Sequence, residues 1–331
     1  CGSPSCLKFN LKRLYNGALY PPPFLLMKSP LKGFLLSLVT AVMWGALPLI
    51  MQQVLTVMHP QTVVASRFLA AALILGVFLQ RRQRLPSWRT LSQPRYGWLL
   101  LAGIFGLVGN FWLFSTALLF LPAAASQVLA QLSPFFLLFA GVFFLKESLG
   151  RNQRIGAAIL FSGILLFFNR ELPTLFAGGL GGKSLGILLS VAACLAWTCY
   201  GLAQKILLRD FSAQQILFVL YCGSALAAAP FATWGELQAL DGYQWLCLLF
   251  CCLNTPIAYG AFAEALNYWE VSKVSTTITL VPLFTIAFAA LGHWLQPQRF
   301  AATDVNLLAA VGAALVVSGA ICSALQQRQK R

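Results

Sequence analysis

The chain has few acidic and histidine side chains for its length. Its 331 residues include eight aspartates and glutamates and two histidines, and charged residues make up 9% of the total. No HExxH or DxxD motif occurs, and both histidines, His59 and His293, fall at predicted helix ends. Intramembrane proteases and metal-dependent lipid transferases need such groups. We therefore predict that the protein is not an enzyme.

Cysteine pairs with metal-ligand spacing are also missing. Nine cysteines are present, but seven fall in apolar stretches, where thiols behave as small hydrophobic groups. Cys251 and Cys252 are adjacent, without CxxC spacing or histidine partners. We expect neither a metal site nor a cofactor.

Apolar side chains dominate instead. They make up 59% of the residues, and the mean hydropathy is +0.77. Period-two alternation is absent, and each apolar run is long enough to cross about 30 Å of hydrocarbon as a helix. The pattern predicts an all-α polytopic protein of the lipid bilayer with ten transmembrane helices, near 34–56, 61–79, 97–119, 124–145, 153–169, 184–204, 213–233, 244–266, 273–293 and 305–325.

The formal charge of +15 reflects membrane orientation. Nineteen of the 23 basic residues fall in the N-terminal arm, in every second loop and in the C-terminal tail. By the positive-inside rule, this bias predicts cytoplasmic N- and C-termini. The charge therefore does not imply a nucleic-acid partner.

Two segments of the sequence occur twice. GAAILFSG at 156–163 is echoed by GAALVVSG at 312–319, and 113–134 by 261–282. Each half holds five predicted spans, and an odd number means that the second copy enters the membrane from the opposite side. The sequence predicts two inverted five-helix repeats, with the chain divided into an extension at 1–26, a first repeat at 28–169, a linker at 170–183, a second repeat at 184–325 and a basic cytoplasmic tail at 326–331.

The extension at 1–26 does not resemble the rest of the chain. Met27, before a short basic arm, reads as a natural start, so we expect residues 1–26 to be non-native or disordered. The Cys1-Gly2-Ser3 opening also fits a mature lipoprotein terminus, but that would place the arm outside, against the charge pattern.

Several short motifs resemble those of one transporter family. Trp44-Gly45 in the first span, Arg67–Leu69 in the second, and a fourth span with Pro134 that leads to Glu147 resemble the drug/metabolite transporter superfamily, EamA branch. The resemblance covers about 28–325 and implies a secondary carrier with a central cavity between its halves. Lys146 stands where the family pattern has glycine, and Gly292-His293 lacks the corresponding carboxylate.

Polar side chains line equivalent faces of spans four and nine. A stripe of two hydrogen-bonding residues and a proline occurs in each, at an offset of 148 residues. Each proline is expected to break its helix. The candidate cavity residues are Gln127, Gln131, Ser275 and Thr279, with helix-break prolines Pro134 and Pro282. The alternative is that these polar groups only join helices.

Aromatic residues recur in spans one and six. Trp44 is matched by Trp197 at an offset of 153, with Tyr200 and Gln204 nearby. These could stack on a substrate, or they could serve core packing or an interfacial belt. Asn110, on a face of small residues in span three, is either a substrate ligand or part of close helix packing.

Three charged residues lie within or beside the spans. For Arg67, snorkelling or carbonyl capping is favoured over substrate contact. Glu147 is predicted to be a structural anchor at the cytoplasmic end of span four. Glu264 is the candidate for proton coupling, because a carboxylate in a low-dielectric site has a raised pKa. The alternative for Glu264 is a salt bridge to Lys205 or Lys273.

These features predict a secondary-active exporter of small metabolites, amino acids or amphipathic compounds that works by alternating access. The location that we expect for such a carrier is the bacterial inner membrane. The few fixed charges suit a neutral, zwitterionic or aromatic small-molecule substrate. A passive channel and a non-transporting membrane partner subunit are the alternatives, although no filter loop or charge ring occurs. The glycine pairs Gly156/Gly163 and Gly312/Gly319 could pack within one subunit or join a homodimer.

Overall fold

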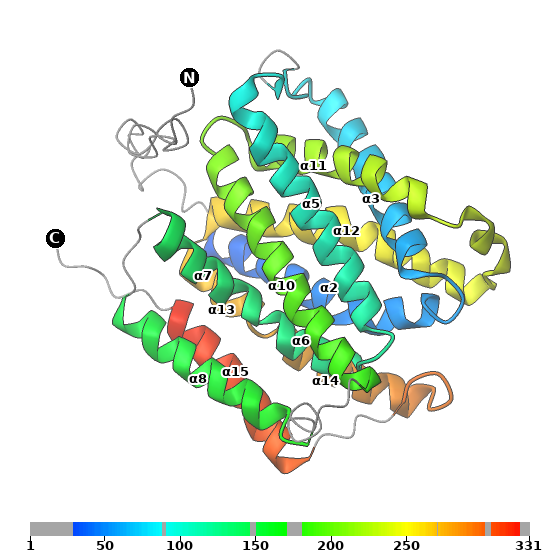
Figure 1. The fold of residues 1–331 in the computed structure, drawn as a ribbon, viewed down its shortest axis with the longest axis vertical. Helices are drawn as coiled ribbons and strands as arrows, with labels where there is room; N and C mark the ends of the chain where they lie inside the picture. The colour runs from blue at the N-terminus through cyan, green and yellow to red at the C-terminus, as the bar shows by residue number, and fades with distance from the viewer. Residues whose placement is uncertain are drawn as a thin grey trace, which may run out of the picture.

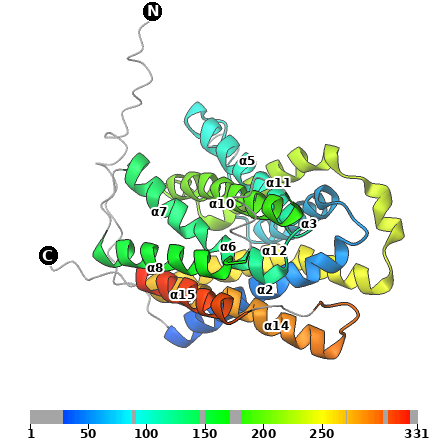
Figure 2. The ribbon, with the colours of Figure 1, turned by 60° about the horizontal axis from the view of Figure 1, so that its bottom comes forward.

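The structure is a computed structural model that describes residues 29–87, 91–145, 150–170, 181–269, 271–301 and 306–324. Every regular element in these ranges is helical, as Figures 1 and 2 show. The prediction of an all-α membrane protein is confirmed. Glu147, residues 1–26 and the tail at 326–331 lie outside the described residues.

The helices follow the predicted apolar runs. In chain order they are α2 (Pro30–Val54), α3 (Pro60–Arg81), α5 (Pro94–Ala117), α6 (Ala123–Ala130), α7 (Leu132–Leu145), α8 (Arg151–Phe167), α10 (Gly182–Leu207), α11 (Ala213–Ala228), η2 (Ala229–Phe231), η3 (Trp234–Ala239), α12 (Gly242–Tyr268), α13 (Val271–Ile278), α14 (Val281–Leu295) and α15 (Leu307–Ala324). Within the described ranges, seven helices are long and apolar enough to cross a membrane, and shorter apolar helices accompany them. The count of ten spans stays a prediction.

Local sequence explains where the helices begin. Pro30, Pro60 and Pro94 stand in the first turns of α2, α3 and α5, where a missing N–H costs no hydrogen bond. At α12, the Asp241 carboxylate accepts from the Gln244 N–H at 2.6 Å, and the Gln244 side chain accepts from the Asp241 N–H at 3.0 Å. This reciprocal pair satisfies two backbone donors that the helix leaves unpaired.

Two helices are interrupted at equivalent places. The helix of span four ends at Ala130 and resumes at Leu132, with Gln131 between α6 and α7. The helix of span nine has Thr279 and Leu280 between α13 and α14. Pro134 lies three residues after Gln131, and Pro282 lies three residues after Thr279. Each proline lacks the N–H that a continuous helix would use for a hydrogen bond across the break. The structure thus carries a paired break in the two halves.

Helices α8 and α15 lie side by side along one edge of the molecule (Figures 1 and 2). A Cβ added at Gly312 would lie 2.4 Å from the Phe167 nitrogen, and one at Gly163 would lie 2.7 Å from the Val316 nitrogen. A Cβ at Gly319 would lie 2.7 Å from the Gly156 carbonyl oxygen. The repeated glycines therefore bring the two backbones together within one chain.

The other major helix contacts also join the two halves of the chain. Helix α5 packs on α10, α2 on α12, and α3 on α11. The largest buried cluster lies among α3, α5, α10 and α11, and includes Phe68, Phe111, Tyr200 and Tyr221. Within the described residues, this largest core is therefore built from both halves of the chain.

Substitution of Gly312 by alanine tests the α8–α15 contact. The added methyl group meets backbone atoms that cannot move aside, so we expect Gly312→Ala to lower the free energy of unfolding by about 1–3 kcal/mol. Gly97→Ala is the matched control, since no atom lies within 4 Å of its added Cβ. Unfolding in detergent measures both; equal stability of the two variants would contradict the close contact.

Candidate functional site

Helix α2 contains a proline, Pro48, which removes one backbone hydrogen bond. A side chain from another helix replaces that bond. Pro48 has no N–H, so the Trp44 carbonyl one turn earlier loses its usual partner. The Gln127 side chain on α6 donates from Nε2 to this Trp44 oxygen at 2.8 Å. Gln127 is 7% exposed. Its amide group therefore joins α6 to α2, and its role in a cavity stays a prediction.

The neighbouring carbonyls of α2 also accept hydrogen bonds from side chains of other helices. Asn254 Nδ2 on α12 donates to the Met43 oxygen at 2.6 Å, and Thr285 Oγ1 on α14 donates to the Gly45 oxygen at 2.9 Å. Donors from both halves thus converge on one turn of α2. Gly45 permits this approach, because an added Cβ would lie 2.7 Å from the Phe284 Cβ.

The predicted aromatic residues Trp44, Trp197 and Tyr200 lie with three further rings in a group that we call the central aromatic cluster: Trp44, Phe111, Trp197, Tyr200, Tyr259 and Phe262. The Trp44 ring lies edge-on to Tyr259 at 5.2 Å and 5.9 Å from Phe262, measured between ring centroids. Phe111 lies 6.4 Å from Tyr259, and Trp197 lies edge-on to Tyr200 at 6.1 Å. Phe111 and Tyr259 were not predicted from the sequence; their helical positions alone do not distinguish them from core residues.

Arg67 lies against this cluster and is 3% exposed. Its Nε donates to Thr255 Oγ1 at 3.2 Å, and Nη1 contacts the Met51 sulfur at 3.5 Å. The guanidinium carbon stands 4.4 Å from the centroid of the Phe111 ring. These contacts differ from the snorkelling or carbonyl capping that the sequence favoured, because the side chain is enclosed and its hydrogen bonds go to side chains.

The remaining predicted residues lie outside the central aromatic cluster. Asn110 Nδ2 donates to the Ala193 carbonyl at 2.9 Å and so joins α5 to α10. Gln131 and Thr279 are buried at the two helix breaks, and Thr279 Oγ1 donates to the Thr276 carbonyl at 2.7 Å. Gln204 is half-buried on α10, one turn beyond Tyr200. The Ser275 side chain lies outside the described part of the chain.

Glu264 lies at one end of the molecule, near a contact between α2 and α12. Its Oε2 accepts from Asn267 Nδ2 at 3.1 Å, and its charge attracts the Lys32 ammonium group. Lys32 Nζ in turn donates to the Tyr268 hydroxyl at 2.8 Å. Lys32 comes from the other half of the chain. The salt bridge from Glu264 to Lys205 or Lys273, which the sequence offered as the alternative, stays a prediction.

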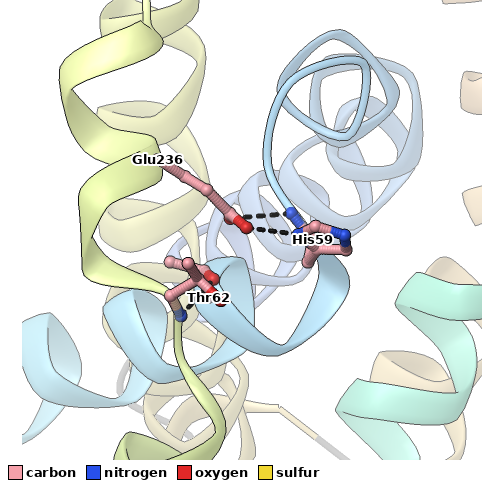
Figure 3. A network of polar contacts seen from close by, with 4 residues as sticks. His59, Thr62 and Glu236 are labelled. Atoms are coloured by element: carbon pink, nitrogen blue, oxygen red, sulfur yellow. Dashed lines mark hydrogen bonds and ion pairs between the residues drawn. The ribbon is translucent and has the colours of Figure 1, made fainter.

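A second contact between the halves lies at the opposite end (Figure 3). The His59 N–H donates to Glu236 Oε2 at 2.9 Å, while the His59 ring contacts Glu236 Oε1. The Thr233 N–H donates to Thr62 Oγ1 at 3.0 Å. Burial raises the pKa of Glu236, but its hydrogen bonds, chiefly with His59, outweigh this effect and hold that pKa below its ordinary value.

Two pockets are formed near this second end, away from the central aromatic cluster. One, of about 180 Å³, is lined by residues 55–60 and Leu119. The other, of about 310 Å³, lies beside α14 and includes Tyr243, Phe288 and Phe300. Neither is lined by Arg67 or by a member of the cluster. Across the described ranges, no group of three or more His, Cys, Asp or Glu side chains could hold a metal ion.

Comparison with known proteins finds one family model, the EamA-like transporter family, which matches residues 31–169 and again residues 184–325. An uncharacterized transporter of Haemophilus influenzae is 45% identical over 298 residues, which cover 90% of this chain and 96% of that protein. The uncharacterized inner membrane transporter YhbE of Escherichia coli K12 is 46% identical and covers 89% of this chain and 92% of its own.

More distant relatives carry a functional name. A probable amino-acid metabolite efflux pump of Salmonella typhimurium is 25% identical over 316 residues, covering 90% of this chain and 96% of that protein. One solved crystal structure is 19% identical and aligns with a TM-score of 0.62 over 91% of this chain and 100% of its own. That likeness concerns the fold alone.

A double-mutant cycle tests the link between Pro48 and Gln127. We expect Gln127→Leu to cost about 1–3 kcal/mol of unfolding free energy, because it leaves the Trp44 carbonyl buried and unpaired. Pro48→Ala restores a backbone donor for that carbonyl, so the cost should fall in this background. Gln131→Leu is the control and should not couple to Pro48→Ala. Additive effects of Pro48→Ala and Gln127→Leu would disprove the link.

Acidification tests the contact between His59 and Glu236. Because the pKa of folded Glu236 lies below the ordinary value of 4.5, its ionised form stabilises the fold above that pH. This contribution is lost as the pH falls through the lower folded-state pKa. We expect the stability advantage of the wild type over Glu236→Gln, measured by unfolding, to shrink as the pH falls below 4.5. An advantage that stays unchanged well below pH 4.5 would argue against this assignment.

Proposed function

Because this chain belongs to the EamA-like transporter family, we propose that it is a secondary-active carrier that exports small metabolites, amino acids or amphipathic compounds. The observation that carries the proposal is the match of the family model to both halves of the chain. Relatives named as probable amino-acid metabolite efflux pumps support both the direction and the substrate class.

The proposed location is the bacterial inner membrane, with several spans and with both termini in the cytoplasm. Seven long apolar helices in the described ranges and a relative named as an inner membrane transporter support the location. The basic loops on one side support the orientation. In this orientation, Glu264 and Lys32 lie toward the cytoplasm, and His59 and Glu236 lie toward the outside.

The proposed architecture is ten spans in two inverted repeats, divided as the sequence predicts. The helix contacts support a two-fold relation, because exchanging the halves turns the α5–α10 pair into the α12–α2 pair. The same exchange maps α3–α11 and α8–α15 onto themselves. The paired breaks at Gln131 and Thr279 obey it as well. Such repeats place a substrate site near the middle of the membrane.

The proposed mechanism is alternating access, with the two end contacts as gates. Thr56 accepts a hydrogen bond from Gln244 at 3.3 Å near the His59–Glu236 contact, so the outer end joins the halves through several polar groups. At the inner end, Lys32 bonds Tyr268, and Gln215 Nε2 donates to the Arg84 carbonyl at 3.1 Å. Closure at both ends fits a carrier better than an open channel.

Glu264 is the proposed proton-coupling residue. Its carboxylate is half-buried and attracts Lys32, whose side chain bridges the two halves at the inner gate. Protonation would neutralise the carboxylate and weaken that attraction, which would favour opening toward the cytoplasm. Proton binding and gate opening would then be linked through one side chain.

Export of metabolites tests this function. Cells that overproduce the wild type, the Glu264→Gln variant or an empty vector are compared for solutes in spent medium. We expect a small metabolite to be enriched only by the wild type, because Glu264→Gln keeps the fold and the amount in the membrane but loses transport driven by a pH gradient. Identical media would contradict export, and full transport by Glu264→Gln across a proton gradient would contradict the coupling role.

A further inference from the structure

We propose that Arg67 binds the carboxylate group of the transported molecule, while the central aromatic cluster contacts an apolar body attached to it. The inference rests on the proposed transport function and names a substrate class for its site: small monocarboxylates with an apolar or aromatic body, whether or not they carry an amine.

The first argument is the cost of the Arg67 charge. A guanidinium group stays ionised in proteins, and a charge within the membrane costs several kcal/mol unless it is paired or wetted. Arg67 is 3% exposed. No ion pair between Arg67 and a carboxylate is found within the described ranges. Arg67 is thus a buried cation without a counter-ion among the described residues.

The second argument is the unused hydrogen-bonding capacity of this side chain. A guanidinium has five N–H donors. The bonds found for Arg67 run from Nε to the Thr255 hydroxyl and from Nη1 to the Met51 sulfur, which is a weak acceptor. No acceptor in the described ranges bonds Nη2. A carboxylate, which accepts two parallel N–H bonds, would occupy the Nη1 and Nη2 donors together.

The third argument is a second polar group without a partner. The Tyr221 hydroxyl on α11 is fully buried and has no hydrogen-bond partner within the part of the chain that the structure describes. It interacts electrostatically with Arg67 and with Tyr200 and Tyr259 of the cluster. Buried hydroxyls are normally paired, so an unpaired one beside an unneutralised cation points to a missing acceptor.

The rings around Arg67 indicate what the rest of the transported molecule is like. Phe111 lies under the guanidinium at 4.4 Å, and its ring leads to Tyr259, which contacts Trp44. Flat apolar rings at these separations suit an aromatic or aliphatic body. At the 153-residue offset, the position equivalent to Arg67 is Leu220, which is fully buried. One cation therefore suits one carboxylate and disfavours substrates with several anionic groups.

Binding to the purified full-length chain tests the proposal with three probes: 3-phenylpropionate, L-phenylalanine and L-phenylalaninamide. The first two carry a carboxylate, and the third replaces it with a neutral amide. Ligand-induced rise of the unfolding temperature gives the apparent affinities. We expect both carboxylates to bind, and the amide to bind at least about tenfold more weakly, since charged hydrogen bonds are lost.

Substitutions assign that difference to the site. Arg67→Lys keeps the charge but loses the planar fork, so the carboxylate probes should bind about tenfold more weakly. Arg299→Lys is the matched control, because Arg299 also lies over an aromatic ring, Tyr243 at 4.1 Å, but is exposed. If Arg67→Lys does not fold, Tyr221→Phe removes only the unpaired hydroxyl and should weaken the carboxylate probes alone.

Equal binding of the amide, unchanged binding by Arg67→Lys, or binding of none of the probes would overturn the proposal. If Arg67→Lys does not fold and Tyr221→Phe is used in its place, unchanged affinity of Tyr221→Phe for the carboxylate probes would overturn the proposal. The transport function is judged separately. If none of the probes binds while the wild type still enriches a metabolite in spent medium, the carboxylate assignment falls and the carrier stands.

Discussion

Hydrocarbon offers no hydrogen bonds, so a backbone carbonyl freed inside the membrane must find its partner within the protein. One turn of α2 shows how this constraint organises the molecule. Pro48 frees the Trp44 carbonyl, and Gln127 of the first half meets it. The adjacent carbonyls receive Asn254 and Thr285 from the second half. This turn is therefore the point where both halves are fixed to one helix.

The central aromatic cluster lies beside this turn of α2, because Trp44 is part of the turn and a member of the cluster. Its ring reaches Tyr259 on α12, and through Phe111 on α5 the cluster reaches Arg67 on α3. The same helices end at the contacts between halves, Lys32 with Tyr268 at one end and His59 with Glu236 at the other. Movement of one half against the other would thus alter the ends and the centre together.

Much of the fold could be predicted from the sequence because membrane helices can be recognised from the length and hydropathy of their apolar runs. The apolar runs correspond to the observed helices, and the breaks at Gln131 and Thr279 lie 148 residues apart, which is the offset between the two polar stripes in the sequence. The family resemblance was confirmed by the match to both halves. Trp44 contacts Tyr259, and Trp197, its counterpart at the 153-residue offset, contacts Tyr200; their role in binding a substrate stays a prediction.

The finer arrangement was not predictable because a helical face does not reveal which neighbour it meets. The sequence places Gln127 on the polar stripe of span four, but its bond to the Trp44 carbonyl depends on the rotation of α2, 83 residues away in sequence. The proline at Pro48 was the available signal, since it frees a known carbonyl. No local signal could pair His59 with Glu236 across 177 residues, or place Phe111 beneath Arg67.

The most direct test of this account is a measurement of distances between spin labels at the two ends. One pair would replace Thr56 and Gln244 at the outer end, and the other Arg84 and Gln215 at the inner end, in a background without native cysteines. The account predicts that conditions which lengthen one distance shorten or preserve the other, so that the two ends open in turn. Simultaneous opening of both ends would indicate a channel and would contradict the carrier mechanism.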